Sequence, residues 1–282
     1  MIAMFFRQLR SELWKLFGKK RTYIGFGAFL VAQVGMLVMF QHSNWQRSTA
    51  RLLEGNGYLA AEYLSALTVA VIMLIPQILL LMPLYASLIG GDMVAKEAED
   101  GTLRMILCRP ISRLRLLIVK WVAGLIFCIV LVGALGTMAV LLARIWFPWS
   151  GMFVNWPPVH VFALMPAGDG LLRYALAHVV LAVNASTIFS LAFMFSCFNM
   201  KPAAATVLGM TFLLANLVLE NMPFFEDYKA FCLTHYFKCW IMVFNQPMNG
   251  AEIVTNLSVI IGFSISAFII GVCAFHVRDI KS

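Results

Sequence analysis

The chain has 282 residues, of which 62% are hydrophobic and only 12% are charged, and its mean hydropathy is +0.87. This small number of charged residues cannot cover the surface of a water-soluble globule of this length. The composition therefore predicts an integral membrane protein. The net charge of +8 would suggest nucleic acid as a partner of a soluble domain. In a membrane chain it indicates orientation and contact with lipid instead, and we expect no nucleic-acid partner.

Residues 1–21 carry an amphipathic pattern ahead of the first long apolar run. Apolar side chains recur there at steps of three and four, at Ile2, Phe5, Leu9, Leu13 and Leu16, with basic residues on the other faces. This spacing predicts a helix that lies in the inner membrane interface, near anionic head groups. The alternative is a basic flank that only orients the first span.

Six apolar runs follow, each long enough to cross about 30 Å of hydrocarbon at about 1.5 Å per residue. They are Thr22 to Phe40, Tyr63 to Ile89, Leu116 to Ala143, Leu171 to Phe198, Pro202 to Leu219 and Thr255 to His276. The expected fold class is therefore an all-α membrane protein with six transmembrane helices in one domain, residues 22–282.

The basic residues are unevenly divided between the two sides of these runs. One side has 15 of them, namely Arg7, Arg10, Lys15, Lys19, Lys20, Arg21, Lys96, Arg104, Arg109, Arg113, Arg115, Lys120, Lys201, Arg278 and Lys281. The other side has 6, namely Arg47, Arg51, Arg144, Arg173, Lys229 and Lys238. Because basic residues favour the cytoplasmic side, both termini are expected there, in a bacterial cytoplasmic membrane.

Three segments fall on the outer side. Residues 41–62 are polar and predict a plain loop, whereas residues 146–170 mix Trp with Pro and cannot form one straight helix. Residues 223–247 are aromatic and bracketed by Pro, which predicts a short pair of interfacial or re-entrant helices. Cys232 and Cys239 lie in this segment, and a disulfide between them would require a non-helical loop.

Several motifs of enzymes are absent from the sequence. It contains no GxxxxGK[ST] phosphate loop, no HExxH and no GxSxG. No Cys and His residues have metal-like spacing, so neither a metal site nor a catalytic residue is expected. Charges are also nearly absent from the apolar runs, which weakens the case for an ion-coupled carrier.

The segment between the second and third runs is dense in helix-breaking and capping signals. Gly90-Gly91 is expected to loosen the end of the second helix, and Asp100-Gly101 to end its extension into water. Thr102 is then placed to cap a short helix, Leu103 to Cys108, which Pro110 stops.

Such a helix, lying across the tip between two membrane helices, is shaped to dock into a groove of a partner protein. Its apolar face consists of Leu103, Ile106 and Leu107, and its charged rim of Glu97, Glu99, Arg104 and Arg109. The alternative is an ordinary solvated turn.

The same segment resembles the signature of ABC type-2 exporter permeases. The resemblance rests on Glu97, Gly101-Thr102-Leu103, Leu107, Pro110, Ser112-Arg113 and Lys120, and more loosely on six spans and the aromatic segment before the last. It implies a coupling helix that sits in a cleft of a separate ATPase, with two permeases and two ATPases in each complex. The residues implied in coupling are Glu97, Gly101, Thr102, Leu103, Arg104, Ile106, Leu107, Pro110 and Arg113.

This chain would then need no cofactor of its own, because ATP and magnesium would bind to the partner ATPase. The second permease copy is expected to be identical, with a heterodimer left open. A different hypothesis is a membrane scaffold or sensor that docks a cytoplasmic protein through residues 92–115 without transport.

Polar residues within the spans are candidates for a substrate path. Asn184, Thr187 and Ser190 follow at three-residue steps in the fourth span, and Asn216 and Glu220 share a face of the fifth. Glu220 is expected near outer water, where it could meet a cationic head group. The alternative is hydrogen bonding between packed spans. Few charges and many Phe residues favour a hydrophobic or amphiphilic cargo over a sugar or an ion.

Overall fold

The computed structural model describes residues 2–108, 111–159 and 161–278. It is 83% helical, and six of its helices are long and apolar enough to cross a membrane. The prediction of an all-α, multi-pass membrane protein is therefore confirmed. These six spans are Thr22–His42, Ala66–Glu99, Arg113–Trp146, Ala167–Cys197, Pro202–Glu220 and Gly250–Val277.

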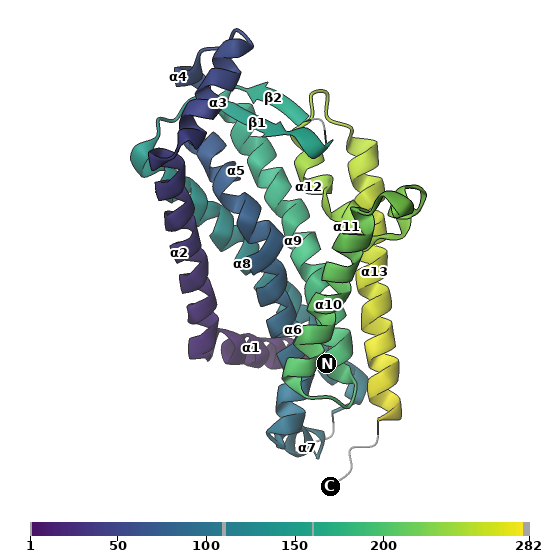
Figure 1. Ribbon diagram of the computed structural model, residues 1–282. Helices are drawn as coiled ribbons and strands as arrows, with labels where there is room; N and C mark the ends of the chain where they lie inside the picture. Colours follow the sequence, from purple (N-terminus) through teal and green to yellow (C-terminus); the bar gives the residue numbers. More distant parts are fainter. Residues whose placement is uncertain (1, 109–110, 160, 279–282) are drawn as a thin grey trace.

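The elements follow one another along the chain and are labelled in Figure 1. They are α1 (Ile2–Gly18), α2 (Lys20–His42), α3 (Asn44–Gly55), α4 (Ala60–Tyr63), α5 (Ala66–Pro76), η1 (Gln77–Leu81), α6 (Met82–Glu99), α7 (Thr102–Leu107), α8 (Arg113–Trp146), β1 (Met152–Trp156), η2 (Pro157–Val159), β2 (Val161–Met165), α9 (Ala167–Cys197), α10 (Pro202–Glu220), η3 (Pro223–Phe231), α11 (Leu233–Phe237), α12 (Cys239–Met242) and α13 (Gly250–Val277).

Helix α9 is the centre of the bundle. It packs against α6, α8, α10 and α13, and it has the largest share of buried residues among the spans. Figure 1 shows α1, α7 and the last turn of α13 at one end of the bundle, with the β-hairpin and α3 at the other. An even number of spans brings both ends of the chain to the same side.

The second span is interrupted in its middle by a π-helical turn, η1, between α5 and α6. Pro76 ends α5, and a proline inside a helix removes one backbone hydrogen bond and displaces the preceding turn. Gln77 compensates in part, because its side chain donates to the Met73 carbonyl at 3.0 Å and accepts from Gln33 of α2 at 3.3 Å. The start of the irregular turn, at Gln77, is thereby buried against protein, where non-helical backbone is tolerated at membrane depth.

Gly90 and Gly91 lie inside helix α6, so the expectation that they loosen its end is wrong. A Cβ on Gly90 would lie 2.5 Å from the Phe189 carbonyl oxygen, and one on Gly91 would lie 2.4 Å from Thr206 Oγ1. The two glycines therefore permit close contact of α6 with α9 and α10, as small residues commonly do between membrane helices.

The end of the bundle opposite α1 and α7 contains more structure than the sequence predicted. Residues 44–55 form helix α3 instead of a plain loop; Ser43 caps it by accepting from the Trp45 amide at 3.1 Å, and Leu53 is fully buried. Strands β1 and β2 form an antiparallel hairpin, with Met152 opposite Met165 and Trp156 opposite Val161. This small sheet is the one departure from an all-helical fold among the described residues.

Residues 223–247 form short helical pieces, η3, α11 and α12, in agreement with the prediction of short helices in place of a span. Cys232 and Cys239 lie on either side of α11 and are both unpaired and buried. Burial raises the pKa of the Cys239 thiol to about 12, which keeps it protonated.

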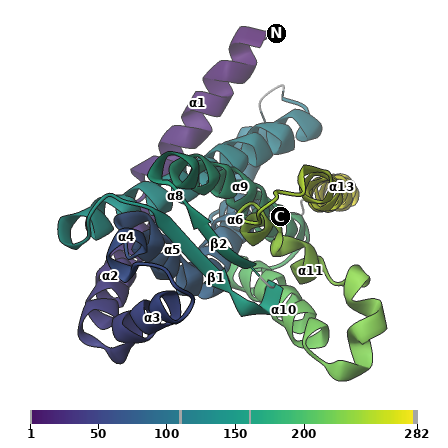
Figure 2. The same cartoon turned by 90° about the horizontal axis from the view of Figure 1, so that it is seen from above.

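Helix α1 runs crosswise to the spans, and Figure 2 shows it projecting from the bundle with the N-terminus at its outer end. Leu9 and Leu16 of its apolar stripe are buried against the rest of the protein, whereas Phe6 and Trp14 are 61% and 79% exposed. Part of the stripe therefore packs on protein. The position of α1 in the membrane interface stays a prediction.

Candidate functional site

Helix α7 forms the tip between the second and third spans. Helix α6 ends at Glu99, and Gly101 then adopts φ +71°, a left-handed conformation that glycine tolerates without strain. The sequence suggested that Thr102 caps α7, but Thr102 is instead the first residue of this helix. Its hydroxyl donates to the Glu97 carbonyl at 3.3 Å. Ser112 caps α8 as predicted, accepting from the Arg115 amide at 3.3 Å.

The faces of α7 differ from the predicted docking surface. Leu103 is 1% exposed and belongs to the core, and Ile106 is partly buried beside it, so neither forms an open apolar face. The exposed residues are Arg104, Met105, which is 66% exposed, and Cys108. The side chain of Leu107 and the whole of Pro110 lie outside the described residues.

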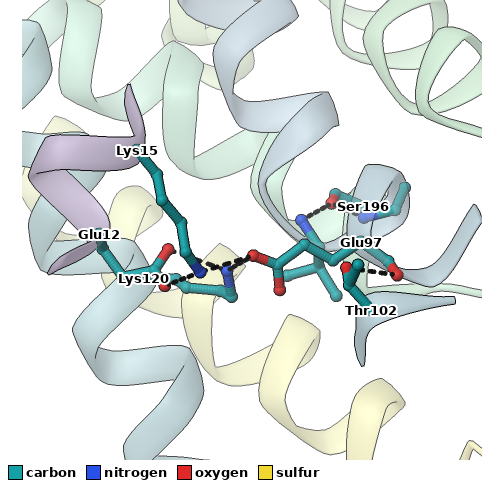
Figure 3. A network of polar contacts seen from close by, with 8 residues as sticks. Glu12, Lys15, Glu97, Thr102, Lys120 and Ser196 are labelled. Carbon is teal, nitrogen blue, oxygen red and sulfur yellow. Dashed lines mark hydrogen bonds and ion pairs between the residues drawn. The ribbon is translucent and has the colours of Figure 1, made fainter. Parts of the chain in front are cut away.

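A buried cluster of ion pairs joins α1, α6 and α8 at the same end of the bundle (Figure 3). Lys120 of α8 has no exposed side-chain surface, and its Nζ lies 3.0 Å from Glu12 Oε2 and 2.7 Å from Glu97 Oε1. Lys15 of α1 lies 2.7 Å from Glu12 Oε1 and 3.4 Å from Glu97 Oε1. Glu97 was predicted on the rim of the docking surface, but it points into the protein because the cation of Lys120 requires a partner there.

The charges of this cluster shift the pKa values of the two α1 residues. Burial alone would raise the pKa of the Glu12 carboxyl, but attraction to Lys120 and hydrogen bonding from Lys15 outweigh it and leave that pKa below its ordinary value. Burial alone would lower the pKa of Lys15, but hydrogen bonding to Glu12 and attraction to Glu12 and Glu97 raise it above its ordinary value. Both groups are therefore charged at neutral pH.

Two further contacts fix this end of α6 and of α8. The Ser196 hydroxyl oxygen of α9 accepts from the Val94 and Ala95 amides at 2.9 Å each, which holds the last turns of α6 against α9. The Arg113 guanidinium at the start of α8 donates to carbonyls at the end of α13, at 3.5 Å to Phe275, 3.2 Å to His276 and 3.3 Å to Arg278. Arg113 thus satisfies carbonyls that a helix end leaves without partners.

Ser190 and Thr187, two of the predicted path residues, are engaged in contacts between helices. Ser190 accepts from Trp121 Nε1 and hydrogen bonds to Ser264, both at 2.8 Å, which connects α8, α9 and α13. The Thr187 hydroxyl lies 3.0 Å from the Val183 carbonyl of its own helix and 3.4 Å from the Ile260 carbonyl of α13. Thr187 also lines a cavity of about 520 Å³ between α8, α9 and α13. Hydrogen bonding between spans explains Ser190 without a substrate.

The two predicted path residues of the fifth span contact residues of the segment 223–247. Asn216 accepts from the Leu233 amide at 3.0 Å. Glu220 is 2% exposed, and its Oε1 lies 2.5 Å from Lys238 Nζ. The expectation that Glu220 stands near open water for a cationic head group is therefore wrong, because Lys238 of the same chain already occupies that position.

Asn184 differs from the other path residues. It is 1% exposed and donates through Nδ2 to the Phe237 carbonyl at 2.9 Å, while its Oδ1 has no hydrogen-bond partner within the described residues. It lines a cavity of about 270 Å³ bounded by the second, fourth and fifth spans and by α11 and α12. Of the five predicted residues, Asn184 alone lines this cavity.

Sequence reasoning missed Glu12 and Lys15, which belong to the ion-pair cluster. It also missed Thr234, which lines the cavity beside Asn184. An acidic residue on the helix face beside an apolar stripe was the available signal for Glu12, but only the fold shows that Lys120 lies opposite. Within the described residues, no group of three or more His, Cys, Asp or Glu side chains is arranged to hold a metal ion.

Comparison with known proteins assigns the family. No curated protein matches the chain significantly. A family model described as ABC-2 family transporter protein matches residues 14–237, which is more than half of the 282 residues. The match includes α7, Asn184 and three members of the ion-pair cluster, Lys15, Glu97 and Lys120. Members of such a family are membrane components that pair with ABC ATPases and are not themselves catalytic. The chain therefore belongs to the ABC-2 transporter family and is a transmembrane permease subunit of an ABC transporter.

Proposed function

We propose that the chain exports a hydrophobic or amphiphilic substrate, driven by ATP that separate ATPase subunits hydrolyse. The complex would contain two permease copies and two ATPases, with ATP and magnesium bound to the ATPases. Both termini and α7 would face the cytoplasm, since the end of the bundle that holds α1 and α7 carries most of the basic residues.

The observation that carries this proposal is the connection of α7 to the spans. Helix α7 is an exposed helix of six residues between two spans of 34 residues each. Leu103 anchors it in the core, and Glu97, five residues before it, is bound to Lys120 of the next span. A push on the exposed side of α7 would therefore move α6 and α8 together instead of bending a loose loop.

The proposed docking surface consists of Arg104, Met105 and Cys108, which replaces the surface expected from the sequence. Met105 is its apolar centre at 66% exposure, and apolar anchors contribute more to most interfaces than charges at the rim. This assignment requires the ATPase to contact the side of α7 that faces away from the core.

Co-purification tests the coupling role. The permease is co-expressed with candidate ABC ATPases of the same genome, and the ATPase retained on the tagged permease is measured for the wild type, Met105→Asp and Met105→Leu. We expect Met105→Asp to release the ATPase while Met105→Leu retains it. Retention by Met105→Asp at the wild-type level would show that α7 is not the docking helix.

Leu103→Asp is the matched comparison, because Leu103 lies on the buried face of α7 and Met105 on its exposed face. Because Leu103 is buried, its replacement is expected to lower the melting temperature of the permease purified alone, whereas Met105→Asp leaves that temperature unchanged.

Stimulation of ATP hydrolysis by lipids or other amphiphiles, measured on the intact complex, then tests the export function itself.

A further inference from the structure

The cavity beside Asn184 lies in the outer half of the bundle. Its volume is about 270 Å³, close to the lower end of the range of small-molecule sites. The π-helical turn η1 forms one wall, α10 forms another, and α9 forms the back, while α11 and α12 close the outer end. An irregular turn next to a cavity is a frequent feature of functional sites in helical proteins.

Apolar side chains make up most of the lining, including Ile78, Met82, Leu213 and Leu217. At the edge, Leu79 and Leu214 are 58% and 49% exposed. The opening is therefore apolar, and a hydrocarbon chain could enter through it without crossing a polar surface.

Two buried polar atoms at this cavity lack hydrogen-bond partners among the described residues. They are Asn184 Oδ1, on a side chain that is 1% exposed, and Thr234 Oγ1, on one that is 9% exposed. Both residues line the cavity. Buried polar atoms are rarely left unsatisfied, so this pair points to a ligand that supplies the missing hydrogen bonds.

The electrostatics of the lining favour a ligand without net charge. Lys238 is the charged residue of the lining, and its ammonium is paired with the buried Glu220 carboxylate at 2.5 Å. Neither charge is therefore left for a ligand to neutralise. Asn184 Oδ1 can only accept a hydrogen bond, whereas the Thr234 hydroxyl can donate or accept. A hydroxyl-bearing head group meets both requirements because it both donates and accepts.

We propose that this cavity binds a neutral, hydroxyl-bearing amphiphile, with its head group on Asn184 and Thr234 and its hydrocarbon chain along η1 and α10. The inference names a substrate class for the exporter proposed above and rests on that proposal for the role of the ligand as cargo. Binding itself depends on the permease alone.

The test uses the purified permease in lipid nanodiscs without any ATPase. The probe is a monoacylglycerol with a photoreactive diazirine in its acyl chain, and the reference is the methyl ester of the same fatty acid, which has no donor. We expect the monoacylglycerol to label peptides of η1 and α10, and Thr234→Val and Asn184→Leu each to weaken its binding about tenfold, the scale of one lost hydrogen bond. The methyl ester should bind weakly to all forms.

Thr187→Val is the control variant. Thr187 lines the separate cavity between α8, α9 and α13, and its hydroxyl also hydrogen bonds within α9. Thr234→Val conserves side-chain shape, so it keeps the test valid if Asn184→Leu fails to fold. Equal labelling by the two probes, or labelling unchanged in both cavity variants, would overturn the site.

The two proposals fail in different ways. Binding at the cavity without stimulation of ATP hydrolysis in the intact complex would support the site and overturn its role in export. Stimulated hydrolysis that is insensitive to Thr234→Val would support the exporter and overturn this site as the place of its cargo.

Discussion

Lys120 and Glu97 form a buried ion pair, with 2.7 Å between Nζ and Oε1, that ties the third span to the end of the second. The lysine side chain is fully buried, and Glu97 and Glu12 supply the opposite charges that a buried ammonium requires. The residue directly before Glu97, Lys96, forms exposed pairs with Glu99 and Asp100 instead. Neighbouring positions of one helix therefore supply a strong and a weak ion pair.

Lys120→Met should destabilise the permease strongly. Removal of Lys120 leaves two largely buried carboxylates, Glu12 and Glu97, that share Lys15 as their remaining cation. Breaking a buried ion pair costs about 3–5 kcal/mol. The melting temperature of the purified protein in detergent is the measurement, and Glu97→Gln combined with Lys120→Met should recover part of the loss. Lys96→Met, which removes only exposed ion pairs, should change the melting temperature little. An equal fall of the melting temperature in Lys96→Met and Lys120→Met would contradict the claim that the buried pair is the stronger one.

Acid should weaken the packing of α1 through Glu12. Its pKa is lower in the folded protein than the ordinary value of 4.5, so the folded state favours the ionised form. The stabilisation is complete above pH 4.5 and is lost as the pH falls through the lowered pKa. Melting temperatures between pH 7 and pH 3 should decline more steeply for the wild type than for Glu12→Gln, and parallel declines would exclude this role of Glu12.

The contribution of Lys15 to stability has the opposite pH dependence and is lost at high pH. Its pKa is raised above 10.5, so its contribution is complete below that value and is lost as the pH rises through the raised pKa. Lys15→Met should therefore abolish the part of the alkaline decline that involves α1. It should also reduce the acid decline from Glu12, because Lys15 is one of the two lysines that lower the pKa of Glu12. The same melting experiment, extended above pH 10, measures the difference.

Gly124→Ala should destabilise the contact between α8 and α9. A Cβ at this position would lie 1.9 Å from Phe189 Cζ, on a ring that is fully buried. Overpacking of this kind costs about 1–3 kcal/mol, and Phe189→Leu in the same chain should relieve it. Gly133→Ala on the same helix meets no atom within 4 Å and should be neutral or slightly stabilising, because alanine favours helix.

The proposed orientation predicts which introduced cysteines are reachable from outside the cell. In a variant whose six native cysteines are replaced, a single cysteine at Ser43, Trp149 or Asn249 should react with an impermeant thiol reagent in intact cells. One at Thr102 or Ser282 should react only after permeabilisation. Labelling at Thr102 in intact cells would reverse the orientation and remove α7 from the reach of a cytoplasmic ATPase.

The sequence predicted the elements whose signals are local. Apolar runs located the six spans within a few residues at most ends, although the second span extends ten residues beyond Ile89, to Glu99. Asp100, Gly101 and Ser112 marked the ends of helices correctly. Helix α3 was missed because its polar surface resembles that of a loop. The burial of Leu53 and the contact of Trp45 with Phe40 become visible only in the fold.

The faces and partners of side chains required the fold. Leu103 looked like a docking residue because the short helix was considered alone, but the core supplies its apolar contact. Glu220 looked solvated because it ends a span, whereas Lys238 folds back over it from the next segment. In both cases a residue distant in sequence decides the environment, and a local pattern contains no information about it.

Arg113 has a consequence for biosynthesis. Its guanidinium emerges from the ribosome with the third span, yet the carbonyls that it binds at the end of α13 lie 162 to 165 residues later. The end of the bundle next to α7 therefore stays incomplete until the last helix has been inserted. A stalled chain that stops before Phe275 would leave this arginine without these acceptors, on a bundle whose other spans are already inserted.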